Sequence, residues 1–451
     1  MKKKLGVIIL FIWMGMMACS KPVEKTNPTE KKEVVLDEKG ETKKTATQPE
    51  EIAVNKIEYG TEQLSLKGKK LDQLTVKGTD NPYYCNLEEN LKMKYDADNI
   101  PILVCKDPVY DITYYVNYGR DNYIYAYRNG KSEVVVEIPA SELFCKDGEL
   151  YFIAETDGKY QFSGFTPGNI LRYNPTSGNV EIVVNGSADN MIVYPDGIYY
   201  KQLGELNQVG MQLSRKEEAC FYSFATEESS SWPLEASDQR RWKGYLLQIK
   251  EEVQEFSESD TIMKDPAMQE LLAQGYKFAG VGTGVIDTIS LVDIQGNVKE
   301  TLQNVKGIPR NCWIGGDSIY YVEQREGENE SEKRSVLRRY NKQTDAHEDI
   351  AELGKLMTLV YTDMIFHNNV VYFSDGLRVE LDTGTQCLMQ KADGSSSFIK
   401  CFYTDGENLF CVSEGKLWLF EEQPSDFVIT REFISGVPLE VGSYVYRLCE
   451  P

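Results

Sequence analysis

A four-strand pattern that recurs along the chain is the sequence feature that most constrains its fold. Residues 141–184 contain one complete copy, in which two short apolar runs flank a turn at Asp147 and Gly148 and two more flank residues 175–178. Each run is rich in β-branched and aromatic residues, and Gly, Asp, Asn or Pro separates it from the next, which is typical of antiparallel strands. Because an isolated small sheet leaves its apolar face exposed, we expect each copy to pack against another copy.

Seven copies of this pattern can be aligned. The second strand of each copy carries an aromatic or apolar marker, and the markers recur every 37 to 52 residues, except for one interval of 74 residues. A four-stranded blade needs roughly 40–50 residues, so the spacing predicts an all-β β-propeller of four-stranded blades. Seven blades are favoured, while six or eight remain possible because the termini could build an extra blade. The markers are Tyr114, Tyr151, Tyr199, Leu246, Tyr320, Tyr372 and Phe410.

The longest interval between markers contains a helical signature. Pro266 is followed by Met268, Leu271 and Leu272 before Gly275. Apolar residues at this spacing, with Pro in the first turn and Gly after the last, predict a short helix. We therefore expect a small helical insertion in the all-β fold.

The N-terminus resembles a bacterial lipoprotein signal. Three lysines precede an apolar run over residues 5–17, which is short for a bilayer span, and the run ends at Met-Met-Ala-Cys19. The resemblance implies that Cys19 becomes the lipid-modified first residue of the mature chain, on the outer side of a bacterial membrane. An ordinary signal peptide or a short membrane anchor is the alternative.

Three segments follow from these patterns. Residues 20–56 contain no aromatic residue and alternate acidic and basic side chains, so they bury too little apolar surface to offset chain entropy. The expected organisation is a signal peptide over residues 1–19, a disordered tether over 20–56 and a propeller domain over 57–451, with clear repeats over about 100–435.

A short signature adds a family resemblance. Tyr372-Phe-Ser-Asp375 resembles the Tyr-Trp-Thr-Asp signature of LDL-receptor-type propellers, and several other repeats keep its aromatic start. The chain is thus similar, over about residues 100–435, to bacterial lipoproteins with an LDL-receptor-related-protein-like β-propeller, a family of unknown function. The resemblance implies the same fold and, by analogy, binding rather than catalysis. It departs at the last signature position in three repeats, at Ala154, Gln202 and Glu323.

Composition argues against several classes of chemistry. The formal net charge of −21 disfavours nucleic acid, which requires clustered Lys and Arg. The two histidines, His347 and His367, lie far apart and are interpreted as surface residues, and no nucleophile elbow or phosphate-binding loop is present. The Asp-Gly pairs lack the alternating acids of a calcium loop, so no metal and no cofactor is expected. We expect a monomer, and binding is favoured over catalysis, although the sequence does not decide whether the protein is an enzyme.

One pair of cysteines stands apart from the rest. Cys401 and Cys411 flank the turn around Gly406 symmetrically. If the two residues oppose each other on a hairpin, they are close enough for a disulfide, which an exported protein could form.

The links between strands two and three are long in several repeats, over about residues 156–168, 203–218, 251–284 and 325–334. In a four-stranded blade these links share one face with the blade-to-blade links. We therefore expect that face to bind a peptide, a glycan or an envelope protein. A polysaccharide lyase or hydrolase with acids at the propeller mouth, or a scaffold for envelope assembly, is the alternative. The expected anchors are Tyr160, Phe162, Phe165, Tyr276 and Phe278.

Overall fold

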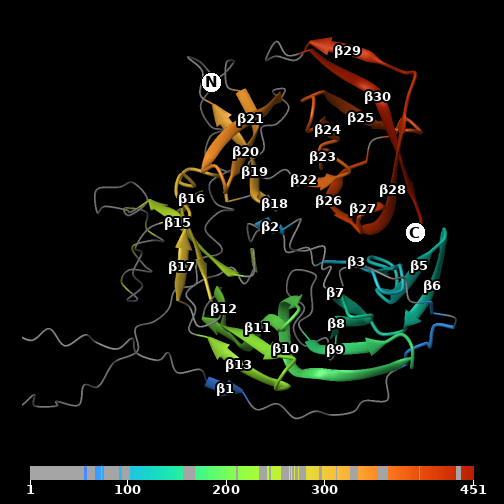
Figure 1. Cartoon of the computed structure of the whole chain (residues 1–451), viewed down its shortest axis with the longest axis vertical. Helices are drawn as coiled ribbons and strands as arrows, with labels where there is room; N and C mark the ends of the chain where they lie inside the picture. The colour runs from blue at the N-terminus through green and yellow to red at the C-terminus, as the bar shows by residue number, and fades with distance from the viewer. Residues whose placement is uncertain are drawn as a thin grey trace, which may run out of the picture. The chain divides into compact units, whose positions relative to one another are not determined.

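The protein is all-β along its described length, apart from a few helical positions. The computed structural model describes residues 55–57, 67–72, 74–75, 91–93, 102–155, 168–209, 212–232, 241–242, 245–254, 264, 266, 269, 273, 281–293, 297–310, 312–325, 334–353, 364–395, 397–432 and 438–451. Within these residues the strands form five sheets (Figure 1), and none of the helical positions belongs to a helix long and apolar enough to cross a membrane.

The chain divides into two compact units. The larger unit comprises residues 54–206, 215–252 and 284–451 and holds nearly all of the strand residues. The smaller comprises residues 1–53, 207–214 and 253–283 and includes helical positions at Pro266, Gln269 and Ala273.

Seven consecutive antiparallel repeats, A to G, account for most of the strands of the larger unit. Repeat A contains β3 (Val104–Asp107), β4 (Ile112–Val116), β5 (Ile124–Arg128) and β6 (Lys131–Val136). Repeat B contains β7 (Ala140–Lys146), β8 (Glu149–Glu155), β9 (Gly168–Asn174) and the first half of β10 (Asn179–Tyr194). Repeat C contains the second half of β10, then β11 (Gly197–Val209), β12 (Gln212–Ser223) and β13 (Glu228–Trp232).

The remaining repeats follow the same order of strands. Repeat D contains β14 (Arg241–Trp242), β15 (Tyr245–Gln254), β16 (Val281–Val292) and β17 (Val298–Thr301). Repeat E contains β18 (Cys312–Gly315), β19 (Ser318–Arg325), β20 (Arg334–Asn341) and β21 (Ala346–Leu353). Repeat F contains β22 (Met364–His367), β23 (Val370–Phe373), β24 (Leu377–Glu380) and β25 (Gln386–Lys391). Repeat G contains β26 (Ile399–Thr404), β27 (Leu409–Ser413), β28 (Lys416–Pro424) and β30 (Pro438–Cys449).

Two long strands join neighbouring repeats into larger sheets. The first half of β10 pairs with β9 and the second half with β11, so repeats B and C share this strand. In repeat G, β30 pairs antiparallel with β28 and parallel with β25 of repeat F. Three short strands lie at sheet edges: β1 (Asn55–Ile57) on β13, β2 (Leu91–Met93) on β18, and β29 (Ile429–Glu432) on β30.

Tight turns join the first and second strands of the repeats. In repeat B, Asp147 and Gly148 both have positive φ, at 52° and 79°, as a two-residue hairpin turn of the favoured hand requires. In repeat F, Asn368 and Asn369 also have positive φ, at 49° and 63°. We call this end of each sheet the turn end. The opposite end, where strand two passes to strand three and one repeat passes to the next, is the link end.

Apolar clusters connect each repeat to the next. Repeats A and B share one cluster, B and C a second, C and D a third, and D and E a fourth, while a fifth spans E, F and G. The cluster of repeats A and B also contains Phe410, Val412 and Leu417 of repeat G. The last repeat therefore packs against the first.

Polar contacts reinforce the junction between repeats G and A. The hydroxyl of Thr113 donates a hydrogen bond to Asp405 at 2.5 Å, and both residues are buried. Lys106 forms an ion pair with Glu407 at 3.0 Å. The backbone N–H of Leu417 donates to the carbonyl of Tyr118 at 3.2 Å.

The strand assignments made from sequence are confirmed. All seven markers lie on the second strand of their repeat, and the helix expected after Lys264 is present at Pro266, Gln269 and Ala273. Two expectations were wrong in part. Much of the link expected over residues 203–218 is strand, because β11 runs to Val209 and β12 starts at Gln212. In the same way, β15 and β16 extend into the link expected over residues 251–284.

The disulfide expected between Cys401 and Cys411 was wrong. The pairing register places Cys411 opposite Phe402 and Cys401 opposite Val412, so the two cysteines point to opposite faces of the sheet. Cys411 is a free thiol, and burial raises its pKa. The thiol of Cys401 lies 3.4 Å from the hydroxyl of Tyr403. The pairing of the hairpin is shifted by one residue from the symmetrical pairing around Gly406, and this shift keeps Cys401 and Cys411 from lying opposite each other.

Candidate functional site

The residues expected to anchor a ligand or a lipid fall outside the described part of the chain. These are Tyr160, Phe162, Phe165, Tyr276, Phe278 and Cys19. The strands that lead into their links are described, however, and repeats D and E carry charged side chains that pair near such links.

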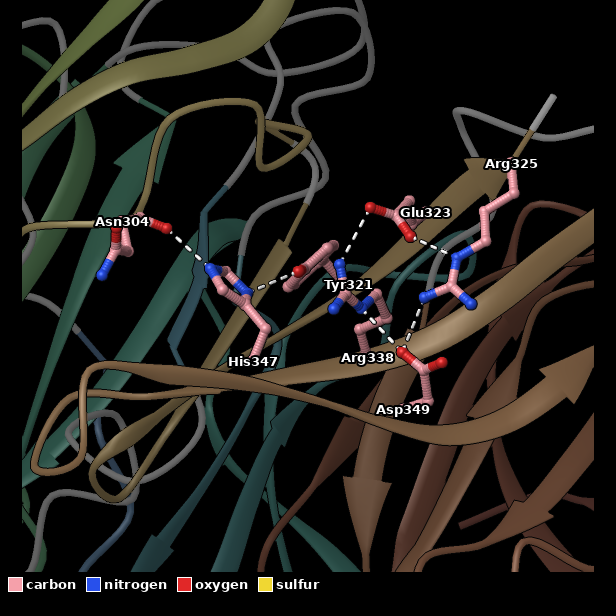
Figure 2. Close-up of polar contacts among 7 residues, drawn as sticks. All are labelled: Asn304, Tyr321, Glu323, Arg325, Arg338, His347 and Asp349. Carbon is pink, nitrogen blue, oxygen red and sulfur yellow. Dashed lines mark hydrogen bonds and ion pairs between the residues drawn. The ribbon is translucent and has the colours of Figure 1, made fainter.

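A closed ring of four charged side chains lies on one face of repeat E (Figure 2). Arg325 donates to Glu323 and to Asp349, each at 2.7 Å. Arg338 donates to the same two carboxylates, each at 2.9 Å. Each guanidinium group thus bridges two carboxylates, and each carboxylate accepts from two guanidinium groups. We call these four residues the charged ring.

Strand periodicity explains why these four residues meet. Successive side chains on a strand point to opposite faces, and residues directly opposite each other share a face. Glu323 and Arg325 are two residues apart on β19, and Arg338 of β20 lies opposite both Tyr321 and Asp349. This face contributes Tyr321 to the apolar cluster shared with repeat D.

The charged ring lies toward the link end. Arg325 is the last residue of β19, and β20 begins at Arg334. In repeat D, Arg310 and Glu251 form a half-buried ion pair at 2.7 Å, and Glu251 also accepts the backbone N–H of Gly284 at 2.6 Å. Both contacts therefore border the expected links.

A separate hydrogen-bonded chain runs from Tyr321, on the same face as the charged ring, to Asn304, which follows the last strand of repeat D. The ring Nδ1 of His347 lies 2.7 Å from the hydroxyl of Tyr321, and its Nε2 lies 2.6 Å from the carbonyl of Asn304 (Figure 2). Because a carbonyl only accepts, Nε2 carries a proton, and a neutral ring accepts the Tyr321 O–H at Nδ1. His347 is half-buried and fully engaged, which corrects its interpretation as a surface residue.

The second histidine is also engaged. Nδ1 of His367 lies 2.8 Å from the hydroxyl of Thr404, which connects repeat F to repeat G. Burial lowers its pKa. Both histidines therefore join neighbouring repeats, a role that their isolated positions in the sequence do not reveal.

The electrostatics of the charged ring favour fixed charges over proton transfer. The hydrogen bond from Arg325 lowers the pKa of Asp349. Burial raises the pKa of Tyr321 to about 12. A general acid or base requires a pKa near the working pH, which neither group has. The arrangement can hold two guanidinium groups in place and present them, but it does not supply acid–base catalysis.

Two carboxyl groups do have raised pKa values, and both are isolated. Burial raises the pKa of Asp107 in repeat A and of Asp375 in repeat F. They belong to different repeats and do not form a pair of catalytic acids. No group of three or more metal-ligating side chains occurs within the described residues.

The sequence carries part of the signal for the charged ring. The third strand of repeat E contains the adjacent residues Arg338 and Arg339, and strand alternation places them on opposite faces. Alternation along the flanking strands would have placed Glu323 and Arg325 on one face. The position of Asp349 on the same face cannot be predicted without the pairing register of β20 and β21, because that register shifts between Leu337 and Arg338.

Comparisons with known proteins reveal only remote likenesses. No family model and no curated protein matches the chain. Among solved structures, Pyrococcus horikoshii acylaminoacyl peptidase is 12% identical with a TM-score of 0.40, covering 75% of this chain and 62% of that one. The extracellular domain of the one component system BT4673 from B. thetaiotaomicron is 10% identical with a TM-score of 0.38, covering 76% and 41%. The computationally designed Ika8 protein is 10% identical with a TM-score of 0.35, covering 72% and 97%.

The chain therefore spans less than two thirds of the first two proteins that it matches. At these scores the likenesses carry no argument about activity, substrate or partner.

Proposed function

We propose that this chain is a lipid-anchored extracytoplasmic protein whose seven repeats form a closed seven-bladed β-propeller that binds a partner at its link end. The observation that carries the proposal is the packing of repeat G on repeat A through Phe410, Thr113 and Asp405. A cyclic order of seven repeats, in which each shares apolar residues with the next and the last packs on the first, is what a propeller requires.

The position of the partner site follows from the long links between strands two and three, which the polar contacts of repeats D and E border. The charged ring of repeat E and the Arg310–Glu251 pair of repeat D both lie toward the link end. The helical positions between β15 and β16 belong to the link of repeat D and are exposed. Links on a rigid scaffold commonly carry binding residues. The expected anchors Tyr160, Phe162, Phe165, Tyr276 and Phe278 belong to links at this end.

Anchoring at the outer side of a membrane rests on the sequence. The basic start, the short apolar run and Cys19 resemble a lipoprotein signal, and the tether that follows would hold the domain away from the membrane. The resemblance to lipoproteins with an LDL-receptor-related-protein-like propeller supports the same placement. Replacement of Cys19 by Ala should release the protein from membranes or leave it unprocessed.

A binding role is favoured over a polysaccharide lyase or hydrolase. A glycoside hydrolase generally uses two neighbouring carboxyl groups, one of them with a raised pKa, and a lyase needs a base whose pKa lies near the working pH. Within the described residues, the raised carboxyls Asp107 and Asp375 lie in separate repeats, and the acids of the charged ring are neutralised by arginine. A scaffold for envelope assembly is the remaining alternative, and it would use the same link end.

The closed arrangement can be tested at the junction of repeats G and A. Thr113→Val and Asp405→Asn should be coupled by about 1–3 kcal/mol in a double-mutant cycle of unfolding free energies, because the two side chains are buried and satisfy each other. A cycle without coupling would mean that the first and last repeats are independent.

The partner site can be tested by exchange of one link. Replacement of residues 255–280 by a short Gly-Ser link should abolish capture of envelope proteins or glycans by the full chain and leave its unfolding transition in place. The matched control replaces the turn at residues 146–149 by another two-residue turn, at the opposite end of a sheet. Equal loss of binding in both variants would remove the site from the link end.

A further inference from the structure

The face of repeat E that looks toward repeat F carries a row of aromatic and charged side chains. The strand register places Trp313 opposite Tyr320, Tyr320 opposite Arg339, and Arg339 opposite Glu348. These four residues share one face because directly opposed residues point to the same side. We call them the aromatic row.

Repeat F contributes a fifth side chain to this row. The ring of Phe366 on β22 lies 4.3 Å from that of Tyr320 and 6.0 Å from that of Trp313. Tyr320 and Phe366 are half-buried, so part of each ring is accessible. Phe366 lies two residues and Tyr320 three residues from a first-to-second turn, which places the row toward the turn end.

Two nitrogen donors of the row lack acceptors. Trp313 is 5% exposed, and no described residue accepts its indole N–H. The Nε of Arg339 is also buried and has no acceptor among the described residues. Buried donors are almost always hydrogen-bonded in native structures, so two such donors on one face indicate a missing acceptor. By contrast, the indole of Trp242 donates to the carbonyl of Gly316 at 2.8 Å.

One carboxylate completes the chemistry. Glu348 forms an ion pair with Arg339, and its side chain is 50% exposed. A ligand that fits must therefore accept hydrogen bonds from N–H groups, donate to a carboxylate, and cover aromatic rings. A hydroxyl group both donates and accepts, whereas a carbonyl or a carboxylate only accepts. A pyranose ring combines several hydroxyl groups with an apolar C–H face, which suits an aromatic surface.

We propose that the aromatic row of repeat E, with Phe366 of repeat F, is a binding site for a pyranose unit of a carbohydrate. The ring stacks on Tyr320 and Phe366. Its hydroxyl groups accept from Trp313 and Arg339 and donate to Glu348. The site lies on the opposite face of repeat E from the charged ring and toward the opposite end of the sheet, so it does not depend on the proposed partner site.

Indole resonances of the full chain test the proposal directly. The protein is labelled with ¹⁵N-tryptophan, and the signal of Trp313 is identified by its loss in Trp313→Phe. Glucose, galactose and N-acetylglucosamine are then added separately to millimolar concentrations, as the weak affinity of a single sugar unit requires. We expect the Trp313 signal to shift and saturate with at least one sugar. The signals of Trp242 and Trp418, whose indoles donate to backbone carbonyls, should stay in place.

Two variants separate recognition from folding. Glu348→Gln keeps the shape of the side chain and removes the charged acceptor, so we expect about a tenfold weaker affinity for the sugar. Phe366→Leu keeps an apolar side chain and removes the aromatic face, with a similar loss. A Trp313 signal that is unmoved by all three sugars, or that moves together with those of Trp242 and Trp418, would overturn the proposal.

Discussion

The two faces of repeat E carry the same kinds of side chain and satisfy them differently. Toward repeat D, Glu323, Arg325, Arg338 and Asp349 form a closed ring in which every charge has two partners. Toward repeat F, one ion pair accompanies three aromatic rings and two donors that have no acceptor in the described part of the chain. Adjacent residues separate the two faces, because Arg338 belongs to one and Arg339 to the other.

The difference shows that polar character alone does not identify a binding site. A network whose hydrogen bonds are complete holds its own geometry, and a ligand gains little there unless it displaces a partner. A face with unsatisfied donors and accessible rings still has interactions to offer. The charged ring is therefore assigned a structural role beside the links, and the aromatic row is the face with capacity for a ligand.

The largest expected effect on stability is at Trp313, on the face toward repeat F. Trp313→Ala removes a buried ring from the junction of repeats E and F and should lower the free energy of unfolding by about 3–5 kcal/mol. Trp313→Phe retains a ring and removes the unsatisfied N–H, so its effect should stay within about 1 kcal/mol. Urea unfolding monitored by circular dichroism measures both.

One outcome for Trp313→Ala and Trp313→Phe would contradict the difference between the two faces of repeat E. If Trp313→Phe costs as much as Trp313→Ala, the indole N–H has an acceptor in solution, and the aromatic row is as satisfied as the charged ring.

An intermediate effect is expected at Tyr321, on the opposite face. Tyr321→Phe removes the hydroxyl that donates to His347 and leaves the imidazole Nδ1 of His347 without its donor. We expect a loss of about 1–2 kcal/mol, and a double-mutant cycle with His347→Phe should show coupling. Additive losses would mean that the chain from Tyr321 through His347 to Asn304 is not formed.

The same variant predicts a change in alkaline stability. Burial raises the pKa of Tyr321 from 10.0 to about 12, so the folded state favours the neutral phenol. This contribution is complete below pH 10 and is lost as the pH rises toward 12. Wild-type protein should therefore lose more stability than Tyr321→Phe over this interval, as measured by urea unfolding at each pH.

The smallest effect is expected at Asp349. The hydrogen bond from Arg325 lowers the pKa of its carboxyl group, so its contribution is present above pH 3.8, the ordinary value, and is lost as the pH falls below it. Because the side chain is 48% exposed, solvent screens the interaction, and Asp349→Asn should cost less than about 1 kcal/mol. The cost should shrink further in high salt. A larger, salt-independent loss would mean that the ring is shielded from water.

Strand placement followed from the sequence with few errors, for a clear physical reason. Short runs of β-branched and aromatic residues between Gly, Asn and Asp turns are local signals, and markers such as Tyr151, Tyr320 and Phe410 all lie on second strands. Turn chemistry was equally local, since Asp147 and Gly148 adopt the positive φ that their types favour.

Register and the ends of strands were harder to predict. Cys401 and Cys411 flank their turn symmetrically in the sequence, but the hairpin pairs Cys411 with Phe402. Much of the link expected from Leu203 onward proved to be strand, because β11 and β12 continue past their apolar residues. Polar residues at the end of a strand carry no alternating apolar pattern, so the sequence does not show where such a strand ends.

By itself, the sequence determined the all-β class, the order of the strands within the repeats, the tight turns and the lipoprotein-like N-terminus, because each depends on residues close together in the chain. Only the tertiary structure decided that repeat G packs on repeat A, that Arg338 and Arg339 serve opposite faces, and that the indole of Trp313 has no acceptor among the described residues. These properties depend on register and on contacts between distant segments. A one-residue shift in pairing reverses every face, and no local pattern records that shift.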